Sequence, residues 1–417
     1  MARILDVYLH EELVGHLTQD DGGQMVFDYA ESWLNKPPAM PLSQSLPLRK
    51  AQFTSRECRG FFAGILPEES KREIIARNLG ISARNDYAML EQIGGECAGA
   101  VTFIPAGETL PERNDSYRKL SPEELVKILK ELPRRPLLAG DEGIRLSLAG
   151  AQDKIAVRLE GGDISLPLGG APSTHILKPA VERFEGVVAN EALCMNLAAA
   201  IGLPTAKVET RVVEDMEYLL VERYDRNYRQ VDGGSHVIER LHQEDFCQAQ
   251  GIVSELKYQK EGGPSLKQCF ALLREVSSAP AIDLRNLLDA VIYNYLVGNN
   301  DAHSKNFSLL YQSIGIGNQQ VRLAPLYDIV STAYYPELSP EMAMKIGGEY
   351  SSGKVGPMNF ERLAEETALA KPMVKRRVPE MAEKVISALP KVEIVNPVAE
   401  AVAKLIHERC ENVQNRF

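Results

Sequence analysis

Asp301-Ala302-His303-Ser304-Lys305-Asn306 stands between an apolar segment with helical spacing and a predicted strand at 307–311. A single loop here would supply a carboxylate from Asp301 and an amide oxygen from Asn306. Phosphoryl transfer needs a carboxylate to orient or deprotonate the attacking hydroxyl, and an oxygen ligand close by for Mg²⁺. The spacing of the two residues, with four others between them, is that of a protein-kinase catalytic loop.

Two more residues fit this interpretation. Asp328, which follows Tyr327, comes after a predicted turn at 315–318 and near the end of a second predicted strand, where a kinase has its second metal-binding carboxylate. Lys178 ends an apolar strand, 175–178, as does the kinase lysine that contacts the α and β phosphates. Each residue alone could be a turn cap or a solvated strand end. Their order and intervals favour the catalytic interpretation.

The segment expected to cover the phosphates does not have the usual glycine-rich motif of a kinase. The chain has no G-x-G-x-x-G, and the pair Gly315 and Gly317 comes after the catalytic loop, on the wrong side of it. The stretch 146–154 has small residues whose backbone N–H groups can approach phosphates, and it ends in Lys154. We expect the phosphate loop there.

Composition limits the remaining possibilities. A chain of 417 residues has room for two or three folding units, and its net charge of -10 opposes a protein that binds mainly to nucleic-acid phosphates. No apolar run reaches the roughly 18 residues of a membrane span, so we expect no membrane contact and a cytoplasmic protein. The six cysteines are scattered and predict reduced, buried thiols.

Local patterns predict the elements around these motifs. A hairpin turn is expected at 20–23, one helix beginning with the capping spacing Ser70 to Glu73 and ending at Gly80, and another capped by Ser121. Strands are expected at 155–159 and 218–222, a helix at 190–201, and mostly helical structure after about residue 239.

Together these motifs resemble the HipA family of serine/threonine kinase toxins, over almost the whole chain. The C-terminal part of the resemblance lies in Ser147-Leu148-Ala149-Gly150-Ala151-Gln152-Asp153-Lys154, the strand ending in Lys178, Val221-Glu222-Arg223-Tyr224-Asp225, Gln243-Glu244-Asp245-x-Cys247-Gln248, the loop from Asp301 to Asn306, and Tyr327-Asp328. The N-terminal part lies in Pro41-Leu42-Ser43-x-Ser45-Leu46-Pro47-Leu48, Phe61-Phe62-Ala63-Gly64-Ile65-Leu66-Pro67 and Ile93-Gly94-x-x-x-x-Gly99-Ala100-Val101.

The resemblance implies an α+β, two-lobed protein-kinase-like fold with an N-terminal β-rich subdomain and an all-α C-terminal lobe. The expected domains are 1–110 (N-terminal subdomain), 111–238 (kinase N-lobe) and 239–417 (C-lobe). It further implies ATP and Mg²⁺ as cofactors, Asp301 as the catalytic base, Asn306 and Asp328 as the metal ligands, and Ser147 as an autophosphorylation site that switches the kinase off. The implied nucleotide site consists of Ala149, Gly150, Ala151, Gln152, Asp153, Lys154, Lys178, Glu222, Arg223, Tyr224, His303, Ser304, Lys305, Asn306, Tyr327 and Asp328.

Partners are implied as well: a HipB-like helix-turn-helix antitoxin, and a protein substrate, an aminoacyl-tRNA synthetase. Where the family's DNA-contacting basic residues would align, this chain reads Glu365-Glu366, so we expect operator DNA to be reached mainly through the antitoxin. We expect the nearby cluster of Lys371, Lys375, Arg376 and Arg377 to be a solvated helix face. Two alternatives stay open, a kinase of small-molecule hydroxyls and a co-repressor with little turnover.

Overall fold

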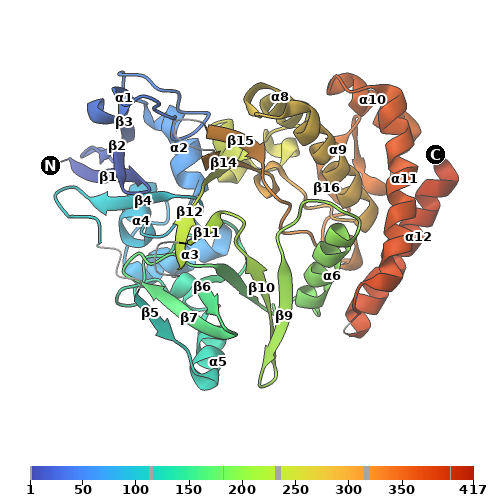
Figure 1. Cartoon of the computed structure of the whole chain (residues 1–417), viewed down its shortest axis with the longest axis horizontal. Helices are drawn as coiled ribbons and strands as arrows, with labels where there is room; N and C mark the ends of the chain where they lie inside the picture. The colour runs from blue at the N-terminus through green and yellow to red at the C-terminus, as the bar shows by residue number, and fades with distance from the viewer. Residues whose placement is uncertain (1, 112–115, 182, 231–235, 314–318, 395) are drawn as a thin grey trace. The chain divides into compact units, whose positions relative to one another are not determined.

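The computed structural model describes residues 2–111, 116–181, 183–230, 236–313, 319–394 and 396–417 (Figure 1). The chain forms two compact units, each built from separate stretches of sequence. Unit 1 comprises Met1–Pro179, Arg211–Ser254 and Leu310–Gln319, and unit 2 comprises Ala180–Thr210, Glu255–Leu309 and Gln320–Phe417. The expected domain limits at 110/111 and 238/239 stay predictions.

Unit 1 begins with a four-stranded antiparallel sheet in the order β3-β2-β1-β4. Its strands are β1 (Arg3–Leu9), β2 (Glu12–Gln19), β3 (Met25–Tyr29) and β4 (Val101–Pro105). The hairpin turn expected at 20–23 is confirmed: the Gly23 N–H donates to Asp20 O at 2.9 Å between β2 and β3. Four helices lie between β3 and β4 in the sequence: α1 (Glu31–Leu34), α2 (Ser55–Gly64), α3 (Glu69–Leu79) and α4 (Asp86–Ile93).

The expected start of α3 is wrong by two residues. Glu68, and not Ser70, is the residue before the helix, and no side chain caps it. Instead the Glu68 N–H donates to Gly150 O at 3.2 Å, so a tertiary hydrogen bond fixes where the chain enters the helix. The other end agrees with the sequence, since Gly80 has φ +67° and ends the helix.

A six-stranded sheet follows, in the order β5-β7-β6-β8-β10-β9. Its strands are β5 (Ser116–Lys119), β6 (Ile155–Glu160), β7 (Asp163–Leu168), β8 (His175–Pro179), β9 (Val208–Val213) and β10 (Met216–Glu222), which confirms the three strands expected here. Before β6 comes α5 (Pro122–Glu131), where Ser121 and Glu124 form the predicted capping box. Apolar residues of both sheets and of α2, α4 and α5 form one continuous core in unit 1.

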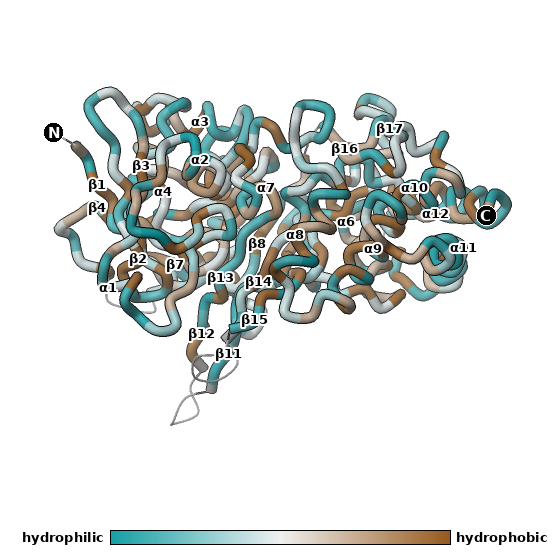
Figure 2. Tube along the Cα trace, turned by 90° about the horizontal axis from the view of Figure 1, so that it is seen from above, coloured by the Kyte–Doolittle hydropathy of each residue, from teal (hydrophilic) through white to brown (hydrophobic). Residues whose placement is uncertain are grey.

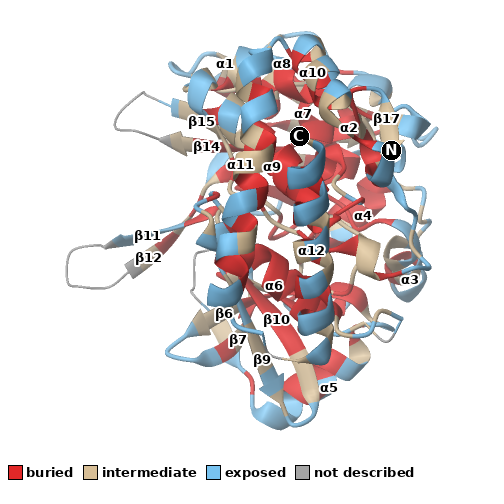
Figure 3. Cartoon of the chain, turned by 90° about the vertical axis from the view of Figure 1, so that its right-hand side faces the viewer, coloured by how far each residue is buried: buried red, intermediate tan, exposed pale blue. Residues whose placement is uncertain are grey.

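Unit 2 is built around α9 (Pro280–Val297), which contacts α8 (Leu266–Val276), α11 (Lys371–Ala388) and α12 (Pro397–Arg416). Figure 3 shows α9 buried behind the exposed faces of α11 and α12, and Figure 2 shows α9 largely apolar and α11 largely hydrophilic. The other helices of unit 2 are α6 (Val187–Ala200), where 190–201 was expected, and α10 (Pro357–Glu366), whereas the short helix α7 (Phe246–Ala249) belongs to unit 1. None of the helices in the described ranges is both long and apolar enough to cross a membrane.

The C-terminal region differs in one respect from the all-α lobe expected. Besides its helices it contains five short strands, of three to six residues: β13 (His242–Asp245), β14 (Ser308–Ser313), β15 (Gln319–Leu323), β16 (Glu341–Ile346) and β17 (Glu349–Ser351). Two of them, β14 and β15, correspond to the strands expected before and after the turn at 315–318. The strands β13, β16 and β17 were not expected, and strands this short give little periodic signal in the sequence. These five strands form two sheets, one in the order β13-β14-β15 and one that pairs β16 with β17. Strands β11 (Arg226–Gln230) and β12 (His236–Arg240) pair with each other in a separate two-stranded sheet. The turn expected at 315–318 lies outside the described residues.

Candidate functional site

The loop that carries Asp301 begins where α9 ends at Gly298. This glycine has φ +75°, and a side chain there would also come within 2.8 Å of Ala333 Cβ, so both backbone and packing favour glycine. The loop is then tied to the segment after Asp328: the Asn300 N–H donates to Thr332 Oγ1 at 2.8 Å, and the Ala333 N–H donates to Gly298 O at 3.0 Å. The two segments that carry the candidate catalytic carboxylates are therefore held to each other by hydrogen bonds.

Asp301 itself is exposed and has one aromatic neighbour that the sequence did not reveal. The hydroxyl of Tyr258 donates to Asp301 Oδ1 at 2.9 Å, and the Tyr258 ring lies edge-on to the His303 ring at 5.5 Å between centroids. Tyr258 precedes Asp301 by 43 residues, so no local motif could have linked them. It holds the carboxylate of Asp301 in one orientation.

Asn306 and Asp328 face each other. Asn306 Nδ2 lies 3.4 Å from Asp328 Oδ2 and 3.5 Å from Asp328 O, while Asn306 Oδ1 is buried and has no hydrogen-bond partner among the described residues. Asp328 has φ +59°, a strained conformation that for a non-glycine residue marks a position under functional or packing constraint. A buried amide oxygen left over beside a carboxylate is a donor set that suits Mg²⁺.

Tyr327 is hydrogen-bonded to the loop that carries Asn306 and to the strand that follows it. Its hydroxyl donates to Lys305 O at 2.7 Å and shares a 2.7 Å hydrogen bond with Ser308 Oγ. Backbone bonds hold the residue before it, since the Leu326 N–H donates to Pro204 O at 2.8 Å. Asp301, His303 to Asn306, Tyr327 and Asp328 are thus brought together in unit 2. The strand expected to end near Asp328 ends earlier, at Leu323 of β15.

The expected phosphate loop lies in unit 1, with Ser147 directed inward. Ser147 is fully buried, and its Oγ donates to Ile65 O at 3.0 Å. Lys154 Nζ donates to Ala149 O at 2.7 Å across the loop, and the intervening Gly150 has φ +107°. Asp153 forms an ion pair with Lys71 at 2.7 Å. In this arrangement the loop is closed on itself and the serine is inaccessible.

Lys178 lies on β8, buried between β6 and β10, with Leu219 opposite it. The segment 222–224 begins with Glu222, the last residue of β10. Its central residue, Arg223, donates its backbone N–H to Thr174 O at 2.9 Å.

The Arg223 side chain belongs to a buried ionic cluster, which sequence reasoning missed. It bonds Asp225 (2.8 Å) and Glu96 (3.2 Å), and Arg226 bonds the same Glu96 (2.5 Å). Burial alone would raise the pKa of Glu96, but the positive charges of Arg223, Arg226 and Arg240 outweigh it and hold that pKa below its ordinary value. The cluster ties the start of β11 to the segment after α4, so its function is structural.

Comparison with known proteins finds two matching family domains. Residues 5–104 match the HipA N-terminal domain, and residues 146–390 match the HipA-like C-terminal domain. The putative kinase Y4mE of Sinorhizobium fredii is 47% identical over 98% of this chain and 93% of that protein. The serine/threonine-protein kinase toxin HipA of Shewanella oneidensis is 28% identical over 93% of this chain and 90% of its own length.

A solved structure agrees with the sequence matches. The Shewanella oneidensis complex of HipA, HipB and operator DNA contains a chain that superimposes with a TM-score of 0.85 at 26% identity, covering 99% of this chain and 97% of that one. The match confirms the expected α+β kinase-like fold. Because the two domain models and the full-length structural match all agree, we conclude that the chain belongs to the HipA-like family of serine/threonine kinase toxins.

Proposed function

We propose that this protein is an ATP- and Mg²⁺-dependent protein serine/threonine kinase and the toxin of a cytoplasmic toxin–antitoxin pair. The observation that carries the proposal is the arrangement in unit 2, where Asp301 lies on the same loop as Asn306 and the unpaired amide oxygen of Asn306 is adjacent to Asp328. A co-repressor without turnover would have no use for the Asp328 carboxylate beside an unsatisfied, buried oxygen of Asn306.

In this proposal Asn306 and Asp328 hold Mg²⁺. The ion, when bound, neutralises charge that develops on the phosphate oxygens. The two residues provide one amide and one carboxylate oxygen, and Mg²⁺ in phosphoryl-transfer sites takes its other ligands from water and substrate phosphates. The donor set therefore fits the ion.

Asp301 is then the base. Its carboxylate accepts the proton of a substrate serine hydroxyl while the serine oxygen forms a bond to the γ-phosphorus, the bond to the β,γ-bridging oxygen breaks, and ADP leaves. Tyr258, which donates to Asp301 Oδ1 at 2.9 Å, leaves Oδ2 to face the incoming hydroxyl. Most of the catalytic effect comes from positioning and charge stabilisation.

In the proposal, three further segments make the other nucleotide contacts. Ala149 to Lys154 contact the phosphates through backbone groups, Lys178 serves as the strand lysine, and Glu222 to Tyr224 contact the adenine. Family membership and the buried position of Lys178 support these roles. His303 to Lys305 and Tyr327 complete the site through the loop that they form.

Regulation is proposed at Ser147. Phosphorylation there would add nearly two negative charges to a buried position beside the phosphate loop and remove the bond to Ile65 O. The loop would then leave its closed arrangement, and ATP would bind poorly.

The proposed partners are a HipB-like antitoxin and a protein substrate, an aminoacyl-tRNA synthetase. The structural match to a HipA in complex with HipB and operator DNA supports the antitoxin. Indirect contact with DNA is supported by the surface of α11, where Lys371 pairs with Glu365, Lys375 with Glu361 at 3.4 Å, and Arg376 with Glu380 at 3.2 Å.

One experiment separates these possibilities. The chain is expressed without antitoxin in a bacterial host, and phosphopeptides are quantified by mass spectrometry against the Asp328→Asn variant. A protein kinase gives serine phosphorylation of a defined protein, with the synthetases as the first candidates. Growth arrest without any new phosphopeptide would support a small-molecule hydroxyl as substrate, and no effect of either protein would support the co-repressor.

A further inference from the structure

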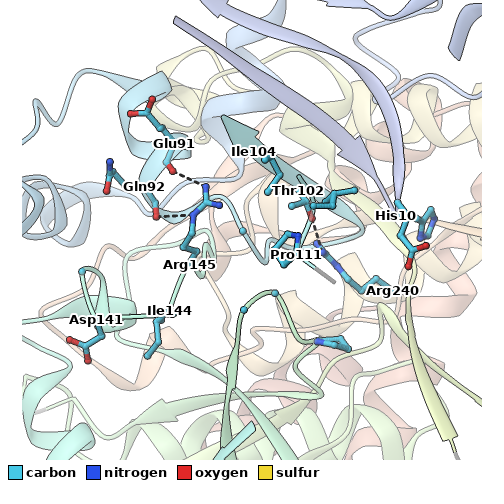
Figure 4. Close-up of a pocket in the computed structure, with 18 of the residues that line it drawn as sticks. His10, Glu91, Gln92, Thr102, Ile104, Pro111, Asp141, Ile144, Arg145 and Arg240 are labelled. Carbon is cyan, nitrogen blue, oxygen red and sulfur yellow. Dashed lines mark hydrogen bonds between the residues drawn. The ribbon is translucent and has the colours of Figure 1, made fainter. Parts of the chain in front are cut away.

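Unit 1 contains a cavity of about 680 Å³ that none of the candidate kinase residues line. Its walls come from α4, from β4, from the last residue of β12 and from the turns at 140–145 and 169–172. Figure 4 shows Arg145 on one side of the cavity and Arg240 on the other, with Ile104 and Thr102 of β4 between them. The volume is in the range of small-molecule sites, typically 300 to 1,000 Å³.

The two arginines that line the cavity lack acidic partners. Arg240 is 7% exposed, and its donors bond neutral oxygens: Val101 O at 2.7 Å, Thr102 Oγ1 at 2.9 Å and Gly99 O at 3.0 Å. Arg145 bonds Glu91 O at 2.7 Å, Phe103 O at 3.1 Å and Gln92 O at 3.4 Å, all of them backbone carbonyls. In the described part of the chain, Nη1 of Arg145 has no acceptor and neither guanidinium forms an ion pair.

The described charges of the adjacent buried cluster also leave Arg240 without a carboxylate partner. Among the described residues, Arg223, Arg226 and Arg240 share two carboxylates, Glu96 and Asp225, and those two pair with Arg223 and Arg226. The charge of Arg240 is therefore left over, and burial lowers its pKa to about 10. A buried charge is costly without a counter-charge, so an anion at this position would relieve the cost.

None of the described acidic residues in the cavity wall forms an ion pair with Arg145 or Arg240. Glu91 pairs with Arg3, and Asp141 pairs with Arg135, so each is already neutralised from outside. Glu11, the third acid in the wall, is exposed at the surface. The described part of the cavity wall presents the two guanidinium groups together with apolar side chains that include Ile104 and Ile144.

We propose that this cavity is a binding site for a small organic anion whose carboxylate or phosphate group lies between Arg145 and Arg240. The apolar wall contacts the carbon skeleton of the ligand, and Nη1 of Arg145 donates to the anionic group. The site adjoins the backbone that holds Ser147 inward, since the Glu96 N–H donates to Arg145 O at 2.7 Å and the Ser147 N–H donates to Glu96 O at 2.9 Å.

The test uses the full-length protein without ATP and two probes, citrate for a carboxylate and glycerol 3-phosphate for a phosphate, each titrated by calorimetry. At least one probe binds, and which one identifies the anionic group. Arg145→Met weakens binding about tenfold or more, because it removes a charged hydrogen bond. Arg134→Met, an exposed arginine outside the cavity wall, makes the same change in net charge and leaves the affinity unchanged.

A second pair of variants guards against a folding defect in Arg145→Met. Gln92 is exposed at the cavity wall, so its replacement leaves the core intact. Gln92→Glu weakens binding a few-fold and Gln92→Lys tightens it by a similar factor, as expected for one charge near an exposed ligand. The proposal is wrong if neither probe binds at 10 mM, or if the bound probe has the same Kd in both Gln92 variants.

Discussion

Tyr258 illustrates how a single hydroxyl can set the geometry of a base. It donates to Asp301 Oδ1 at 2.9 Å, and its ring packs edge-on against His303. We predict that Tyr258→Phe lowers kcat for phosphoryl transfer about tenfold or more, because a hydrogen bond to a charged group is lost. The KM for ATP stays unchanged, since Tyr258 orients the base and not the nucleotide.

Tyr350→Phe is the matched control, because it removes a hydroxyl elsewhere in unit 2 for which the structure gives no hydrogen bond among the described residues. Steady-state kinetics with a serine peptide or protein substrate separate the two parameters. A Tyr258→Phe enzyme with unchanged kcat, or with a change only in KM, would remove Tyr258 from the catalytic arrangement.

Glu244 is a buried carboxyl outside the catalytic arrangement, and it gives unit 1 a dependence on pH. It accepts from Ser43 Oγ at 2.5 Å and from the Gln44 N–H at 3.0 Å, as well as from the Tyr311 hydroxyl, yet burial dominates and raises its pKa to about 7. The folded protein thus keeps a proton that the unfolded chain releases near pH 4.5. Unfolding releases this proton between pH 4.5 and 7, so stability falls as pH rises through that window.

We predict that Glu244→Gln, which imitates the protonated carboxyl, loses this dependence. Each pKa unit corresponds to about 1.4 kcal/mol, so above pH 7 the charged Glu244 costs the wild type up to roughly 3 kcal/mol. The melting temperature of the wild type, relative to the variant, should therefore fall by several degrees between pH 5 and pH 8. Glu73→Gln, an exposed glutamate on α3, serves as the control, and parallel pH profiles for all three proteins would show that Glu244 is ionised in the fold.

The closed arrangement of the phosphate loop determines how self-inactivation at Ser147 can proceed. Ser147 is fully buried and bonded to Ile65 O, so phosphorylation requires the loop to leave this arrangement first. With MgATP, the wild type should slowly gain one phosphate at Ser147 and lose ATP affinity in step with it, whereas Ser147→Ala should keep its affinity. Intact-protein mass spectrometry and nucleotide titration at matched times follow both quantities.

Two findings would contradict self-inactivation through this loop. One is a wild type that stays unmodified at Ser147 while it phosphorylates other proteins. The other is a modified protein whose affinity for ATP equals that of the unmodified one.

The elements themselves show which parts of the structure the sequence could predict. Helix α5 was predictable because Ser121, Pro122 and Glu124 encode its start locally, and β6, β8 and β10 because their apolar runs are bounded by turn residues. The start of α3 was not predictable, because a tertiary bond from Glu68 to Gly150 O replaces the local cap.

The same distinction applies to the candidate site. The order and spacing of Asp301, Asn306 and Asp328 are local information, and the structure places the last two face to face. The contacts of Tyr258 with Asp301 and of Arg223 with Glu96 join residues 43 and 127 positions apart, and no sequence pattern encodes them. The structure was needed to find both.

For the whole molecule, the surface of α11 predicts how the protein reaches DNA. Lys375 and Arg376 already pair with Glu361 and Glu380, so the surface offers little free positive charge. Lys375→Ala combined with Arg376→Ala should leave operator affinity unchanged in the complex with the antitoxin. Arg377 is excluded from this test because it forms two 2.6 Å hydrogen bonds with the buried Asp289 of α9 and supports the fold.

The salt dependence of operator binding checks this prediction. Each lost phosphate contact lowers the slope of log K against log[salt] by about 0.9. An unchanged slope agrees with binding through the antitoxin, and a decrease of about two would mean that both residues touch phosphates.

The most direct measurement is transfer of labelled phosphate from ATP to protein serine by the wild type and by Asp301→Asn. Asparagine keeps the shape of the side chain and an oxygen for the Tyr258 hydroxyl but cannot take the substrate proton, so we predict a loss of several orders of magnitude with an unchanged melting temperature. Asp215→Asn, which changes an exposed aspartate in unit 1, should transfer phosphate like the wild type. If Asp301→Asn keeps near-normal transfer with a normal melting curve, Asp301 is not the base and the proposed kinase mechanism is wrong.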